Sequence, residues 1–180
     1  MTGLRTRGVA LIAVLAVTAP VAAETIDRVL AVVAGQLIML SDVTAVRALG
    51  IVTPSPGADP TASVLNKLID RELELAEVDR YSPPEPDAAE IDRGLAAVRA
   101  RFPSEKAFAD VLARSGFDTA HVREIVRQNL RLRAYLDQRF VVPDGDQQRR
   151  QQLIDDWIAS LRRRSPVINL YEPQKTAAAR

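Results

Sequence analysis

A short β-strand pattern near the end of the chain places the strongest constraint on the fold. Residues 167–171 (VINLY) follow Pro166 and have the composition of a strand, whereas residues 153–161 before them repeat apolar side chains at helical spacing. An isolated strand would leave its backbone donors and acceptors without partners. The rest of the sequence must therefore supply another strand.

Residues 28–39 (RVLAVVAGQLIM) supply that partner strand. Two β-rich runs flank Ala34 and Gly35, and glycine at the second turn position tolerates the positive φ of a tight hairpin. Strict alternation gives the first strand two apolar faces, one with Val29, Ala31 and Val33 and the other with Leu30 and Val32. We expect both faces to be covered; the alternative is that one face is left free for a ligand. The terminal strand then adds to this hairpin.

The residues between the hairpin and the terminal strand predict helices joined by short connections. Gly50, the loop TPSPGAD, the linker YSPPEPD and Gly116 separate these helices. The expected N-caps are Ser41 for a helix over residues 42–49, Asp59 before Pro60, Ser104 and Asp118. The sequence therefore predicts a mainly α domain over residues 24–172, with a small antiparallel sheet of an N-terminal hairpin and a C-terminal strand. Residues 173–180 are expected to form a flexible tail.

The first residues have the pattern of a secretory signal peptide. Arg5 and Arg7 precede an apolar stretch at residues 8–17, and a small-residue triplet at 21–23 suits cleavage before Glu24. The apolar stretch is shorter than the roughly 20 residues that span a membrane. The alternatives are a buried helix or an uncleaved anchor. We expect residues 1–23 to be removed and the mature chain to work outside the cytoplasm.

Charge and cysteine content narrow the possible functions. Removing residues 1–23 takes two arginines and no acids from a chain with 24 basic and 23 acidic side chains, so a formal charge of −1 remains. This balance argues against a nucleic-acid partner, which would require a concentrated basic face. The chain has no cysteine. It therefore has no disulfide framework or thiol nucleophile and must be held together by burial.

The pattern of titratable residues does not point to an enzyme. His121 is the only histidine, and it falls in the first turn of a predicted helix, where a solvated polar role is favoured over a ligand or general base. No glycine-rich phosphate loop follows a strand. Glu72 falls within an apolar stripe, where we expect it to pair with an arginine or to lie at the stripe's edge. No catalytic residue, metal or small-molecule cofactor is predicted.

Four segments, taken together, resemble the chaperone module of the SurA-type periplasmic proteins. The hairpin followed by Ser-Asp at a helix start is the most specific of them. The segments are ETIDRVLAVVAGQLIMLSDV, LNKLIDRELELAEVDRY, FDTAHVREIVRQNLRLRAYLDQRF and LIDDWIASLRRRSPVINLY. The resemblance implies a periplasmic helical domain that binds unfolded outer-membrane protein chains in a crevice and prevents their aggregation.

The sequence departs from that family in one respect. Members of the family usually carry parvulin-type prolyl isomerase domains between the last two of these segments, but here only VVPDGDQQRRQQ lies between them. A domain needs at least about 50 residues. Isomerase activity is therefore not carried over, and the sequence at Asp144-Gly145 is expected only to reverse the chain.

A chaperone of this kind needs exposed apolar surface rather than catalytic groups. The candidate peptide-binding residues are Met39, Phe102, Phe108, Phe117 and Tyr135, with ordinary core packing as the alternative for each. We expect some of them to line a groove beside the hairpin. Two other functions stay open: an envelope adaptor with one fixed protein partner, and a protein related to peptidyl-prolyl isomerases.

Overall fold

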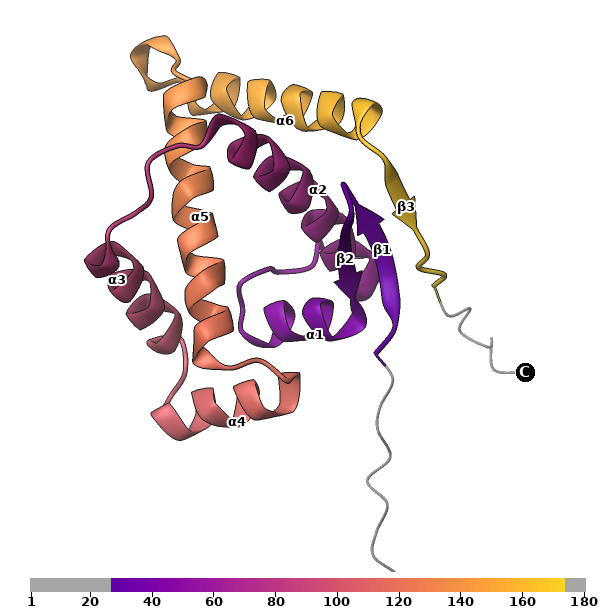
Figure 1. Cartoon of the computed structure of the whole chain (residues 1–180), viewed down its shortest axis with the longest axis vertical. Helices are drawn as coiled ribbons and strands as arrows, with labels where there is room; N and C mark the ends of the chain where they lie inside the picture. Colours follow the sequence, from indigo (N-terminus) through magenta and orange to yellow (C-terminus); the bar gives the residue numbers. More distant parts are fainter. Residues whose placement is uncertain (1–26, 174–180) are drawn as a thin grey trace, which may run out of the picture.

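Three antiparallel strands bring the two ends of the fold together (Figure 1). The structure is a computed structural model, and it describes residues 27–173. The strands are β1 (Val29–Val33), β2 (Gln36–Met39) and β3 (Val167–Asn169), in the order β2-β1-β3. The predicted signal segment and residues 174–180 of the predicted tail lie outside the described range.

The terminal strand adds to the hairpin, as the sequence predicts. Val32 in the middle of β1 faces Leu37 of β2 on one side and Ile168 of β3 on the other. The backbone N–H of Leu170 donates to the carbonyl of Leu30 at 2.8 Å and so extends the pairing beyond β3. The prediction of a mainly helical fold with a small antiparallel sheet, closed by the last strand, is confirmed.

The hairpin turn forms where expected, but the strand alternation is broken. Ala34 and Gly35 both have positive φ, 48° and 87°, which matches the right-handed twist of the two strands. A register irregularity between Val29 and Ala31 leaves both Leu30 and Ala31 fully buried. A bulge allows consecutive residues to point toward the same side of a sheet. The predicted two-face alternation was therefore wrong at Leu30.

Six α-helices lie between the hairpin and β3 in the described chain. They are α1 (Leu40–Ala48), α2 (Pro60–Tyr81), α3 (Ala88–Arg99), α4 (Glu105–Ser115), α5 (Thr119–Arg139) and α6 (Gln147–Arg164). A 3₁₀ turn at Pro143–Gly145 joins α5 to α6 and, as predicted, only reverses the chain. None of the helices in residues 27–173 is both long and apolar enough to cross a membrane.

The predicted caps hold for three helices and fail for α1. The side chains of Asp59, Ser104 and Asp118 accept backbone N–H groups at the starts of α2, α4 and α5. Helix α1 instead begins at Leu40, and the Asp42 carboxylate accepts the Met39 N–H at 2.7 Å. Ser41 is already inside the helix, and its hydroxyl donates to Asp27. The prediction of Ser41 as the cap was wrong because β2 runs into the helix without a loop.

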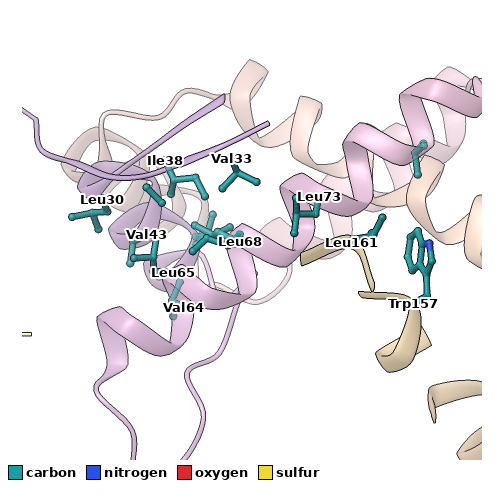
Figure 2. Packing of buried hydrophobic residues seen from close by; sticks show 14 of the residues in the cluster. Leu30, Val33, Ile38, Val43, Val64, Leu65, Leu68, Leu73, Trp157 and Leu161 are labelled. Carbon is teal, nitrogen blue, oxygen red and sulfur yellow. The ribbon is translucent and has the colours of Figure 1, made fainter. Parts of the chain in front are cut away.

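The apolar side chains form two clusters. The first cluster lies under the sheet and along α2, where the apolar side chains of β1, β2, α1 and α2 converge (Figure 2). It consists of Leu30, Ala31, Val33, Ile38, Val43, Val46, Val64, Leu65, Leu68, Ile69, Leu73, Val78, Tyr135, Trp157 and Leu161. The second cluster lies between α3, α4 and the first half of α5. It consists of Leu49, Ile91, Leu95, Val98, Phe108, Leu112, Val122 and Val126.

Candidate functional site

An open groove lies beside β2, bounded by α1, α2 and α5. Its volume is about 450 Å³. Much of its wall is apolar, formed by Leu37, Val46, Ile51, Val52, Leu68 and Ile125. Phe117, in the turn before α5, lies on the same wall, with its ring stacked on His121 at a centroid distance of 5.4 Å. The groove therefore offers apolar surface next to the edge of a β-sheet.

A second hollow of about 300 Å³ continues the groove toward the hairpin turn. The two share Gln36, Glu72 and Gln128 as lining residues. This end is polar, but its charges are matched within the protein. Arg131 lies 2.8 Å from Asp79 and 3.0 Å from Glu85, and Arg127 pairs with Glu85 and Glu124. The polar end therefore carries hydrogen-bonding groups without a large net charge.

A partly buried ion pair lies between the apolar and polar ends. Arg71 Nη1 lies 3.2 Å from Glu72 Oε1, and Arg71 also donates to Gln128 at 2.7 Å and to Asn129 at 3.3 Å. Burial raises the pKa of Glu72 and lowers that of Arg71, while their mutual attraction opposes both shifts. The prediction that Glu72 pairs with an arginine is confirmed.

Of the five candidate residues from the sequence, only Phe117 lines this groove. Phe108 is 1% exposed in the second cluster, so in this structure it has no surface for a ligand. Phe102 is partly buried against Phe108, with the two rings 5.4 Å apart. Tyr135 is buried in the first cluster and borders a different cavity. Met39 is partly buried at the start of α1 and does not line the groove.

The sequence predictions missed most of the groove wall. Ile51 and Val52, between the Gly50 helix stop and the loop TPSPGAD, were assigned to no element and to no site, yet both line the groove. Ile125 is one of several apolar residues at helical spacing on α5, and it lies between the first cluster and the groove. The spacing of apolar residues along the sequence cannot distinguish a residue that packs in the core from one that lines a groove.

The outer face of the sheet is apolar and exposed. Leu37, Ile168 and Leu170 are 57%, 55% and 54% exposed, and Val32 lies between Leu37 and Ile168 in the strand register. Leu37, on the edge strand β2, borders both this face and the groove. The expectation that both sheet faces are covered was therefore wrong. The helices pack against the inner face only, because β1 and β2 carry Leu30, Val33 and Ile38 there. The exposed outer face instead agrees with the alternative prediction, in which one face of the sheet is left uncovered.

The titratable residues around the groove do not form a metal site. His121 is exposed and lies 2.8 Å from the Asp118 carboxylate, which also accepts its backbone N–H. Within residues 27–173, no group of three or more potential ligands is arranged to hold a metal ion. What the groove offers is therefore apolar contact and hydrogen bonding.

No family model matches the chain, and no curated protein matches it. The resemblance to SurA-type chaperones therefore stays a prediction made from the quoted segments.

Proposed function

We propose that this protein is an ATP-independent periplasmic chaperone that binds unfolded polypeptides, including outer-membrane proteins, and prevents their aggregation. The observation that carries the proposal is the groove of about 450 Å³, with apolar walls and an edge strand on one side. Unfolded chains expose apolar side chains and unpaired backbone groups together. A groove that satisfies both can bind many sequences with modest affinity.

Strand β2 supplies the backbone contacts in this mechanism. Val33 and Gln36 flank the two-residue turn, so they form a hydrogen-bonded pair, and the backbone groups of Leu37 point away from β1. An extended client segment can pair there while its side chains contact Ile125 and Phe117 across the groove. Holding the client in this way lowers the free concentration of the aggregation-prone chain by mass action.

The first test compares two substitutions on the same sheet. Leu37 and Ile168 are almost equally exposed, but only Leu37 lines the groove. Threonine is β-branched and suits a strand, so neither substitution should disturb the sheet. We expect Leu37→Thr to weaken the suppression of aggregation of several unrelated denatured proteins by at least threefold, and Ile168→Thr to leave it unchanged. Equal loss of suppression in both variants would indicate that clients bind the outer sheet face and would contradict the groove as the binding site.

Crosslinking provides a second, independent test. A photoreactive residue replacing Leu37 should capture a denatured client, whereas one replacing Val141, which is 77% exposed in the connection between α5 and α6, should not. Crosslinks confined to Val141 would contradict the groove as the binding site.

The exposed apolar sheet face favours an adaptor as the second candidate function. A fixed protein partner would cover Leu37, Ile168 and Leu170 in one stable stoichiometric complex. In that case Ile168→Thr would dissolve the complex, and unrelated denatured proteins would not be protected. We propose no isomerase activity, and acceleration of cis/trans exchange in a prolyl peptide would contradict this part of the proposal.

A further inference from the structure

A separate cavity lies where the C-terminal ends of α2 and α5 meet. Its volume is about 270 Å³, and it shares no lining residue with the groove. The cavity is lined by Tyr81, Pro83, Tyr135, Gln138 and Arg139. Two aromatic rings and a proline make most of its wall apolar, so it suits an aromatic or aliphatic side chain.

Arg139 is a cation above this aromatic cluster. Its guanidinium carbon lies 5.6 to 6.0 Å from the ring centroids of four aromatic residues, which places it within the range of cation–π attraction. The rings belong to Tyr81, Tyr135, Phe140 and Trp157. Within residues 27–173, Arg139 has no carboxylate within ion-pair distance. Because no carboxylate engages them, its planar donors can bind an anion.

Tyr135 adds a second donor without an acceptor. The residue is only 6% exposed, and its Oη is buried without a hydrogen-bond partner in the described chain. Burial raises the pKa of this phenol, while the nearby Arg139 partly opposes the shift. Arginine has donors only, so it cannot accept the Tyr135 O–H. A buried hydroxyl without an acceptor is costly, and a ligand oxygen would remove that cost.

The carboxylates around the cavity already have cationic partners. Glu77, one turn before Tyr81 on α2, lies 3.0 Å from Arg164 and 3.6 Å from Arg80. Asp137, two residues before Arg139, lies 2.6 Å from Arg150. The negative end of the α5 dipole opposes an anion at this place. Arg139 must therefore provide most of the attraction for one.

We infer that this cavity binds the C-terminal carboxylate of a polypeptide whose last residue is aromatic or large and apolar. The carboxylate accepts hydrogen bonds from the Arg139 guanidinium and the Tyr135 hydroxyl, and the last side chain packs between Tyr81 and Pro83. The free carboxylate suits the donors of Arg139 and Tyr135, and the apolar side chain suits the aromatic wall. The inference extends the proposed function, because an unfolded client would supply the chain end.

The test uses a short peptide, Gly-Ser-Gly-Ser-Gly-Phe, with a fluorescent label at its N-terminus. Fluorescence anisotropy should show binding of the free acid, and the C-terminal amide should bind at least tenfold more weakly because it removes the charge. Trp157 is the only tryptophan and its ring lies 5.9 Å from the Arg139 guanidinium, so its emission should also change with the free acid. Equal binding of acid and amide would overturn the inference.

Two variants test whether Arg139 and Tyr135 bind the peptide carboxylate. Arg139→Gln should weaken binding of the free acid at least tenfold and leave binding of the amide unchanged. Tyr135→Phe removes only the hydroxyl and should weaken binding of the acid by a factor of two to ten. Arg163→Gln, at an exposed arginine of α6, is the matched control and should change neither. Unchanged binding in Arg139→Gln, with its circular dichroism intact, would overturn the assignment.

The same proteins separate this inference from the proposed function. Leu37→Thr should suppress aggregation at least threefold more weakly while still binding the free acid. Failure of the peptide to bind, with suppression intact, would overturn the carboxylate site alone. Binding of the peptide without suppression of any client's aggregation would support the site and contradict the chaperone proposal.

Discussion

The two apolar clusters differ in how much of the chain each one joins. The first cluster places Leu30 of β1 in the same core as Leu161 of α6, so it needs segments from both ends of the described chain. The second cluster uses Leu49 and residues from 91 to 126, which are mostly close in sequence. The first therefore depends on contacts with a high loop-closure cost, and the second on local helix packing.

The two clusters also differ in their buried charges. Glu77 and Arg131, 7% and 8% exposed, lie on α2 and α5 near the first cluster. On α3 and α4 the buried polar residue is Ser115, whose hydroxyl donates to the Leu112 carbonyl. Ion pairs made by these two residues therefore lie at the border of the first cluster.

Trp157→Ala should be the most disruptive change in the first cluster. The indole lies 5.8 Å from the Tyr135 ring and 5.5 Å from the Phe140 ring, and removing it leaves a large cavity. We expect the free energy of unfolding to fall by about 3–5 kcal/mol, measured by urea unfolding followed by circular dichroism. Trp157→Phe, which keeps a ring, should cost about 1 kcal/mol. A loss of only about 1 kcal/mol for Trp157→Ala would mean that the neighbouring side chains move in and fill the cavity.

Phe108→Ala should have a slightly smaller and more local effect. The side chain is the largest in the second cluster, but the partly exposed Phe102 beside it can move into the space. We expect a loss of about 3 kcal/mol, at the lower end of the usual range. Amide hydrogen exchange should rise in α3 and α4 and stay slow in β1. Equal acceleration in β1 would show that the two clusters unfold as one unit.

Gly94→Ala tests the close packing of α3 on α5. A Cβ at residue 94 would clash with a Val126 methyl carbon, so alanine should overpack this contact and cost about 1–2 kcal/mol. Helix propensity alone predicts the opposite sign, a gain of about 1 kcal/mol. The double variant Gly94→Ala, Val126→Ala should recover part of the loss in thermal unfolding. A more stable single variant would exclude the close contact.

Glu74→Gln should give the smallest effect, and only at higher pH. Burial raises the pKa of Glu74 from its ordinary 4.5 to about 7. Between these values the folded protein holds a proton that the unfolded chain has lost, so the stability of the wild type falls as the pH rises. The variant should be more stable than the wild type by about 1 kcal/mol at pH 8, allowing for partial exposure, and equal at pH 4.

The control for this titration is Asp156→Asn, at an exposed acid of α6. At pH 8 the stability difference from the wild type in urea unfolding should be larger for Glu74→Gln than for this control. A stability of Glu74→Gln that tracks the wild type from pH 4 to pH 8 would contradict the raised pKa.

Local chemistry made much of the fold predictable from the sequence. The pair Ala34-Gly35 specifies its turn, the prolines after Tyr81 exclude a helix, and Asp59 caps α2 through its own side chain. Each of these features depends on neighbouring residues only. The pairing of β3 with β1 is a long-range contact, and it was predictable because a lone terminal strand needs a partner.

Features that depend on the surroundings of a residue were harder to predict. Phe108 and Phe117 have the same side chain, but one fills the second cluster and the other lines the groove. Ser41 has the chemistry of a cap and instead bonds to Asp27, fourteen residues earlier in the chain. The outer sheet face could not be recognised as exposed, because an apolar strand has the same composition whether one or both faces are covered.

The position of β1 between β2 and β3 sets an order of events during synthesis on the ribosome. Strand β1 is among the first described segments to emerge, and its partner on one side, β3, is the last strand to do so. Until then one edge of β1 has no intramolecular partner, and the nascent chain carries an open pairing site of its own. Helices α3 and α4 can pack on α5 before β3 is made, whereas closure of the sheet has to wait until β3 has emerged.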